Sequence, residues 1–114
     1  MVDQLGRLEQ LVLFAVLRLD EDAYGATIRR ELEERTGRRL TTAAIYTTLR
    51  RLEARELVSS WIGEPTPERG GRRKKFYRLE PAGLTALEQT WREVREMGAG
   101  LAAKLNRRLE EPGR

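Results

Sequence analysis

Apolar residues recur at three- and four-residue steps along the first third of the chain, which is the period of helices with one buried face. The first stretch predicts a helix over about residues 3–18, and the second predicts a helix that runs through Ile28 and Leu32 to Thr36. Three acidic residues at 20–22 precede the second stretch, where Asp can cap a helix and negative charge suits the N-terminus. Gly37 is expected to end that helix.

A third helix is the best specified of the predicted elements. Thr41 is a good N-cap, and Leu40 and Ile45 occupy the two positions of a hydrophobic staple. Ile45, Leu49 and Leu52 form the predicted buried stripe. At 100° per residue, the opposite face carries small, hydroxyl and guanidinium groups, with Ala44 and Tyr46 on its flanks. These outward residues are Ala43, Thr47, Arg50, Arg51 and Ala54.

The period changes after residue 57. Two short runs rich in aromatic and β-branched residues, at 57–62 and 74–79, are typical of strands, and the segment between them is rich in Gly, Pro and Arg. The pattern therefore predicts a hairpin with a long basic tip, in which Trp61 packs. Pro81 then suits the first turn of a last helix, predicted to run to about Leu109.

The last helix carries a second regularity. Seven positions alternate by three and four residues, which is the seam of a coiled coil over about three heptads. They are Leu84, Leu87, Trp91, Val94, Gly98, Leu101 and Leu105. Because three helices and a hairpin already supply a core, this seam predicts contact with a second chain. Trp91 is more simply a packing residue, but facing its mate near Gly98 it would line a pocket for a flat apolar effector.

Composition narrows the chemistry. With 114 residues the chain is one compact domain, or one small domain with an appendage. It has no Cys and no His, so thiol nucleophiles, an imidazole base and Cys/His zinc sites are excluded, and no phosphate-binding glycine motif occurs. We expect no catalytic residue, no metal and no cofactor. No apolar run approaches a membrane span and the start lacks the form of a signal peptide, so a cytoplasmic location is expected.

Charge is unevenly distributed. The net charge is +4, but between Arg38 and Arg78 eleven Lys and Arg face only four Glu. This local excess suggests a polyanionic partner, most often nucleic acid. Three helices followed by a basic hairpin are the layout of a winged helix, a mainly α fold whose third helix enters the major groove.

Several motifs within that layout resemble the PadR family of transcriptional regulators. They are LGRLE at 5–9, YG at 24–25 with Ile28, AIYTTLRRLE at 44–53, GGRRKKFYRL at 70–79 and PAG at 81–83. The chain departs from the family pattern where Glu56 replaces a usual glycine and Glu80 a usual threonine. The resemblance implies a bacterial or archaeal repressor that dimerises through its C-terminal helix, binds pseudo-palindromic operator DNA and is often released by a small molecule. The short C-terminal part is similar to the smaller PadR subfamily.

From the residues and this resemblance we expect a winged helix-turn-helix domain at 1–80, a dimerisation helix at 81–110 and a tail at 111–114. The expected partner is double-stranded DNA, bound by a homodimer. The expected DNA-binding residues are Arg38, Arg39, Thr42, Ala43, Tyr46, Thr47, Arg50, Arg51, Arg69, Arg72, Arg73, Lys74 and Lys75. The alternatives are an ordinary solvated surface, a winged helix that binds an acidic protein, and a nucleic-acid enzyme whose only candidate carboxylates on the third helix are Glu53 and Glu56.

Overall fold

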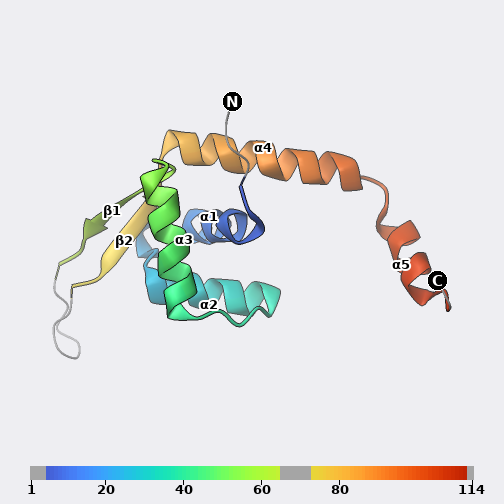
Figure 1. Cartoon of the computed structure of the whole chain (residues 1–114), viewed down its shortest axis with the longest axis horizontal. Helices are drawn as coiled ribbons and strands as arrows, with labels where there is room; N and C mark the ends of the chain where they lie inside the picture. The colour runs from blue at the N-terminus through green and yellow to red at the C-terminus, as the bar shows by residue number, and fades with distance from the viewer. Residues whose placement is uncertain (1–4, 65–72, 113–114) are drawn as a thin grey trace.

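The computed structural model describes residues 5–64 and 73–112. In chain order the elements are α1 (Arg7–Leu19), a 3-10 turn η1 (Asp20–Asp22), α2 (Gly25–Thr36), α3 (Thr42–Ala54), β1 (Val58–Ile62), β2 (Lys75–Leu79), α4 (Pro81–Gly98) and α5 (Ala102–Glu110) (Figure 1). Helices α1, α2 and α3 form one packed unit, and the two antiparallel strands extend from it as a hairpin. This mainly helical winged-helix arrangement confirms the predicted fold class.

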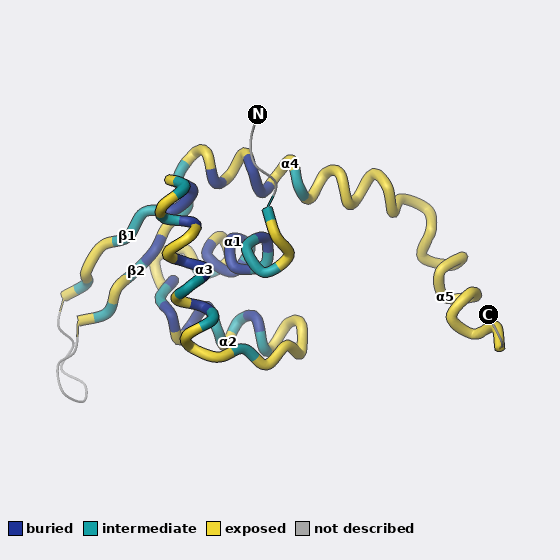
Figure 2. The backbone as a smooth tube through the Cα atoms, in the orientation of Figure 1, coloured by how far each residue is buried: buried dark blue, intermediate teal, exposed yellow. Residues whose placement is uncertain are grey.

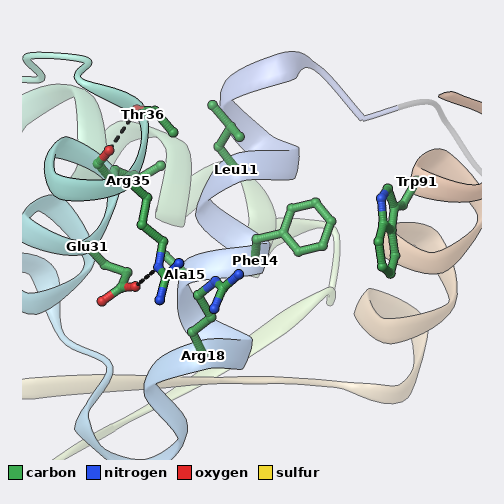
Figure 3. A pocket seen from close by; sticks show the side chains of 9 residues that line it. Leu11, Phe14, Ala15, Arg18, Glu31, Arg35, Thr36 and Trp91 are labelled. Atoms are coloured by element: carbon green, nitrogen blue, oxygen red, sulfur yellow. Dashed lines mark hydrogen bonds and ion pairs between the residues drawn. The ribbon is translucent and has the colours of Figure 1, made fainter. Parts of the chain in front are cut away.

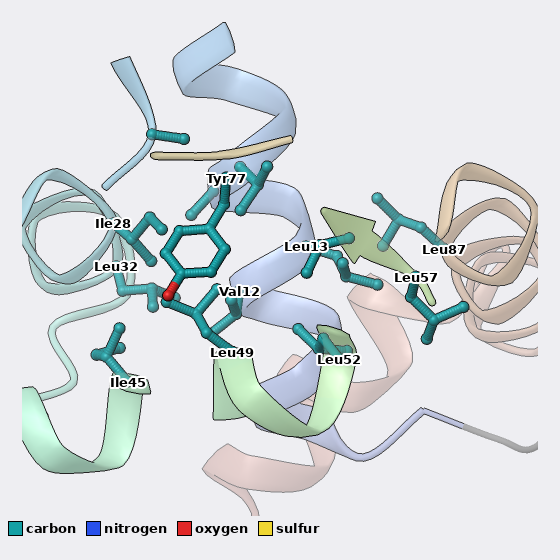
Figure 4. Packing of buried hydrophobic residues seen from close by; sticks show 14 of the residues in the cluster. Val12, Leu13, Ile28, Leu32, Ile45, Leu49, Leu52, Leu57, Tyr77 and Leu87 are labelled. Carbon is teal, nitrogen blue, oxygen red and sulfur yellow. The ribbon is translucent and has the colours of Figure 1, made fainter. Parts of the chain in front are cut away.

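The core is built from the apolar faces of α1, α2 and α3, closed by β2 and the start of α4. Figure 4 shows Tyr77 of β2 among side chains of these three helices. The largest fully buried side chains are Leu13, Ile28, Ile45, Leu49, Leu52, Val12, Val16 and Val58. The predicted stripe of α3 is therefore buried.

Two helix boundaries follow the expected local chemistry. The Oγ1 atom of Thr41 accepts a 3.0 Å hydrogen bond from the backbone N–H of Ala44, so Thr41 caps α3 as predicted. Gly37 adopts φ +72°, the left-handed conformation that ends many helices, and its N–H donates to the Glu33 carbonyl.

The first two helices begin later than predicted. Helix α1 begins at Arg7 because the N–H of Gly6, its N-cap, donates to Glu9 Oε1 at 2.8 Å. The acidic residues form the separate turn η1 and do not cap α2. At the start of α2, Thr27 Oγ1 instead accepts from the Tyr24 N–H at 3.0 Å.

The predicted single C-terminal helix is wrong. The chain breaks between Gly98 and Ala102, where Gly100 adopts φ +77°, and α5 continues in a new direction (Figure 1). Two glycines within three residues remove the side chains that favour a continuous helix, and Gly100 supplies the left-handed turn. The resulting arm, α4 with α5, leaves the packed unit, and most of it is exposed (Figure 2).

The start of α4 is fixed by a close backbone approach. Pro81 occupies the first turn as predicted, and the Glu80 N–H donates to the Leu57 carbonyl at 3.0 Å. A Cβ on Gly83 would lie 2.1 Å from that same carbonyl oxygen. Glycine at this position therefore lets α4 lie directly against the loop between α3 and β1.

Candidate nucleic-acid interface

Helix α3 presents the predicted outward face. Thr42, Ala43, Tyr46, Arg50 and Arg51 are exposed and Thr47 is half-buried. On the opposite side Thr48 is buried, and its hydroxyl donates to the Ala44 carbonyl at 2.9 Å. Side chains of small and guanidinium type therefore project from a rigid helix, as a helix that enters the major groove requires.

Four arginines on and before α3 are free to meet an anion. Arg50 and Arg51 lie on α3, and Arg38 and Arg39 lie in the turn before it. Within the ranges 5–64 and 73–112, none of these four guanidinium groups forms an ion pair with a carboxylate. An arginine without an acidic partner can donate to phosphate oxygens or guanine edges without first breaking an internal contact.

Tyr46 lies partly against the protein. A Cβ on Gly25 would approach the Tyr46 hydroxyl oxygen to 2.4 Å, so the ring lies directly over the first residue of α2. Tyr46 is 37% exposed. Its position at the junction of α2 and α3 thus combines a packing role with an accessible edge, and the glycine of the YG pair is the sequence signal for this contact.

The hairpin supplies cations at the base of the wing. Arg73 and Lys75 are exposed and Lys74 is half-buried. The Lys74 ammonium lies 4.6 Å from the centre of the Tyr24 ring and 3.4 Å from its hydroxyl oxygen. Trp61 stacks on Phe76 with ring centres 5.5 Å apart, consistent with its predicted packing role. Arg69 and Arg72, also predicted to bind DNA, lie outside the described residues.

Glu53 joins α3 to both strands, a role that the sequence analysis missed. Its Oε2 atom accepts a 2.6 Å hydrogen bond from Ser60 Oγ on β1, and its Oε1 atom lies 3.8 Å from Lys75 Nζ on β2. Lys75 is therefore already ion-paired within the chain. The alternation of strand residues places Ser60 and Lys75 on the hairpin, but their approach to an α3 carboxylate depends on the packing of the hairpin against the helix.

Tyr77 lies beside this cluster. Burial raises the pKa of its hydroxyl above the ordinary value of 10.0, and the nearby charges of Glu53 and Tyr46 raise it further, while Arg50 lowers it. The cause is that burial and a neighbouring carboxylate both disfavour a phenolate. Tyr77 therefore stays protonated and neutral over the whole physiological range.

The predicted seam is exposed, with one exception. Leu84, Trp91, Val94, Leu101 and Leu105 are among the exposed large apolar residues. Leu87 is 3% exposed and belongs to the protomer core, so it is not available to a second chain. The heptad pattern cannot separate these cases, because both sides of a half-buried helix carry leucine.

Trp91 lines a pocket with α1 and α2 of its own chain. The pocket has a volume of about 330 Å³, and its lining includes Leu11, Phe14, Leu32 and Arg35 (Figure 3). The Trp91 and Phe14 rings meet edge to face with centres 5.6 Å apart, and the Arg95 guanidinium lies 4.8 Å from the Trp91 ring centre. Gly98 does not line this pocket but a separate hollow beside α5. The predicted pairing of Trp91 with a space at Gly98 is therefore not seen within the protomer.

Two negative findings apply to the described part of the chain. No group of three or more acidic or other metal-ligating side chains lies close enough to hold a metal ion. None of the described helices combines the length and apolar character needed to cross a membrane.

A three-helix unit with a two-stranded wing, an arginine-bearing third helix and cations at the wing base defines a winged-helix DNA-binding protein. The comparisons with known proteins specify the family. The model of the transcriptional regulator PadR-like family matches residues 13–89. The chain belongs to this family and is a DNA-binding transcriptional regulator, and PadR regulators are non-enzymatic.

Individual relatives agree with this assignment. The chain is 32% identical to uncharacterized protein X of Lysinibacillus sphaericus over 97 residues, 81% of this chain and 84% of the relative. It is 36% identical to the transcriptional regulator Rv3488 of Mycobacterium tuberculosis over 78 residues, 68% of each chain. A crystal structure of a PadR family transcription regulator from hypervirulent Clostridium difficile R20291 superposes with a TM-score of 0.72 at 25% identity, covering 88% of this chain and 99% of that one.

Proposed function

We propose that the chain is a homodimeric repressor of the smaller PadR subfamily that binds a pseudo-palindromic operator. Residues 1–80 form the DNA-binding unit, residues 81–110 form the dimerisation arm, and residues 111–114 form a tail. Residues Thr42, Ala43, Tyr46, Thr47, Arg50 and Arg51 of α3 contact base edges and flanking phosphates. The remaining cations contact phosphates: Arg38, Arg39, Arg69, Arg72, Arg73, Lys74 and Lys75.

The single observation that carries this proposal is the exposed face of α3. Arg50 and Arg51 stand beside Ala43 and Thr47, and no carboxylate of the described residues pairs with either guanidinium. Arginine can make paired hydrogen bonds to guanine, and small methyl groups can pack on thymine, so the face suits base recognition. The wing cations supply affinity that does not depend on sequence.

Dimerisation is supported by the exposed apolar residues of the arm. Trp91 and Val94 are each about half exposed on α4, and no described residue of the protomer covers them fully. A symmetric contact between two such arms would hide both faces and place two α3 helices about 34 Å apart, one turn of B-DNA.

Release by a small apolar effector is the remaining part of the proposal. Trp91 supplies a flat ring at the edge of a largely apolar pocket, and the ring lies on the arm that we assign to dimerisation. A ligand that stacks on Trp91 would therefore change the arm that sets the spacing of the two α3 helices. Quenching of Trp91 fluorescence in the Trp61→Phe variant, over a panel of flat apolar dyes, tests this point; an unchanged signal would count against it.

The experiment that tests the DNA proposal is selection of bound fragments from genomic DNA, followed by footprinting. We expect protection of two inverted half-sites about one helical turn apart. Arg50→Ala and Arg51→Ala should abolish selection, whereas Arg92→Ala on α4 should not. Protection of a single half-site by a monomer would refute the homodimer. If DNA binding ignores sequence while an acidic protein is bound through the same arginines, the chain is a protein-contact module instead.

A further inference from the structure

Helix α5 has an apolar face that its own protomer leaves uncovered. Leu101, Leu105 and Leu109 recur at four-residue steps and are 47%, 60% and 76% exposed. An isolated helix of nine residues is marginal in water, because helices shorter than about 12 residues depend on tertiary packing. The helix therefore needs a surface to cover these three leucines.

A groove suited to such a helix lies at the other end of the protomer. It has a volume of about 1090 Å³ and lies between the end of α1, the turn η1, the outer side of the hairpin and the start of α4. Its apolar lining includes the exposed Leu17, Trp61 and Leu84, and three carboxylates line it: Asp20, Glu21 and Glu64. On α5 the leucines are flanked by Lys104, Arg107 and Arg108, so the charges of helix and groove are complementary.

The chain cannot bring α5 to its own groove in the described conformation, because α4 carries α5 away from the hairpin (Figure 1). A second copy can. If two α4 helices run antiparallel with seam facing seam, one register pairs Leu84 with the partner's Leu101, Leu87 with the partner's Gly98, and Trp91 with the partner's Val94.

The buried state of Leu87 favours this register over its neighbour. Sliding one helix by a heptad would set Leu105 against Leu87, whose side chain is already buried, and would leave Leu84 without a seam partner. In the first register the inward-turned Leu87 faces Gly98, which has no side chain. The exposed apolar residues Leu84, Trp91, Val94 and Leu101 then all meet one another.

This register delivers α5 to the groove. Leu84, which lines the groove, meets the partner's Leu101, and α5 begins at the next residue. The elbow between α4 and α5 has a hollow of about 460 Å³ lined by Gly98, Leu101 and Leu105, and it can receive the exposed Leu84 of the partner. We propose that α5 of each protomer packs in the groove of the other, so that the two copies exchange their C-terminal helices.

This inference rests on the proposed homodimer, and disulfide trapping separates the two. The chain has no cysteine, so introduced pairs report without background. We expect Leu84→Cys with Leu101→Cys to form a covalent dimer, which tests the pairing of the α4 helices. We expect Leu17→Cys with Leu105→Cys to form a covalent dimer as well, which tests the docking of α5. Ala43→Cys with Leu105→Cys is the control and should stay uncrosslinked, since Ala43 is exposed on α3.

The outcomes are distinct on a non-reducing gel. A crosslink through residues 84 and 101 without one through residues 17 and 105 would overturn the exchange and leave the homodimer standing. A disulfide between residues 17 and 105 within one chain would also overturn it, because α5 would then occupy its own groove. A monomer in sedimentation that forms neither crosslink would refute the homodimer and the exchange together.

Charge reversal gives an independent measurement on dimers without cysteine. Glu21→Arg should weaken dimerisation by about tenfold, and Arg108→Glu in the same chain should restore it. Glu34→Arg, on the exposed side of α2, is the matched control and should leave the dimer constant unchanged. Circular dichroism checks that each variant is folded. Equal dimer constants for all variants would overturn the docking of α5 in this groove.

Discussion

Single residues of this chain carry departures from local preference that can be measured. Glu56 follows α3 and adopts φ +59°, a left-handed conformation in which a side chain costs about 1–2 kcal/mol relative to glycine. The sequence analysis noted that PadR proteins usually have glycine there, and the backbone supplies the reason. The Glu56 N–H donates to the Glu53 carbonyl, so the turn is held in place despite the strain.

We therefore predict that Glu56→Gly stabilises the protein by about 1 kcal/mol, which is about 4–8 °C in Tm for a domain of this size. Thermal unfolding followed by circular dichroism measures the shift. Glu34→Gly, in the helical interior of α2, is the matched control and should destabilise by about 1 kcal/mol. A loss of stability in Glu56→Gly would contradict the strain argument.

A second pair of variants concerns the glycines of α4. Gly83→Ala would bring a Cβ to 2.1 Å from the Leu57 carbonyl oxygen, so α4 must shift, and we expect a loss of about 2–3 kcal/mol. Gly98→Ala meets no atom within 4 Å and should be neutral or slightly stabilising. Urea unfolding of the two variants checks the difference; equal stability would show that α4 does not approach Leu57 so closely.

Tyr77 predicts a pH dependence. Its pKa is raised in the folded protein relative to 10.0, so folding retains a proton that the unfolded chain releases. The contribution to stability is complete below about pH 10 and is lost as the pH rises through the folded pKa. The stability of the wild type should thus fall relative to Tyr77→Phe between about pH 9 and 11 in urea unfolding. A constant difference would argue against the shift.

At the scale of elements, Glu53 sets how α3 and the wing act together. Because Lys75 is paired with Glu53, this lysine is less available to DNA than the sequence suggested. Glu53→Gln retains an oxygen that can accept from Ser60 but removes the charge that holds Lys75. We predict tighter DNA binding, with the slope of log K against log salt steeper by about 0.9 for each phosphate gained.

Salt titrations of DNA binding measure this slope. Glu34→Gln removes the same charge from α2, away from the described ion pairs, and controls for net charge. An unchanged slope in Glu53→Gln would mean that Lys75 does not reach a phosphate once it is released.

The elements themselves were largely predictable from the sequence, because period, caps and turn residues agree. Thr41, Gly37 and Pro81 fixed boundaries that the structure confirms. What could not be predicted depends on tertiary contact. The break after Gly98 was considered only as a kink, and Leu87 was assigned to the seam because a heptad pattern does not show which of its leucines the protomer buries. The Glu53 cluster required the hairpin to be placed against α3.

At the scale of the whole molecule, the chain divides its surface by function. The winged helix places cations on α3 and at the wing base, and the arm places exposed apolar residues on the other side of α1 (Figure 2). The arm makes the molecule long, with extents of 57 × 34 × 20 Å, and leaves its C-terminal half without a partner in the protomer. Two protomers joined through their arms would combine both surfaces into one symmetric DNA-binding unit.

The central claim is that α3 recognises a specific sequence. Fluorescence anisotropy tests it most directly, with a labelled duplex from the promoter of the protein's own gene, a scrambled duplex, and low and near-physiological salt. We predict binding to the promoter that survives the higher salt and exceeds the scrambled control by about a thousandfold, with the difference lost in Arg50→Ala. Equal binding to both duplexes that disappears with salt would contradict the claim and leave only an electrostatic surface.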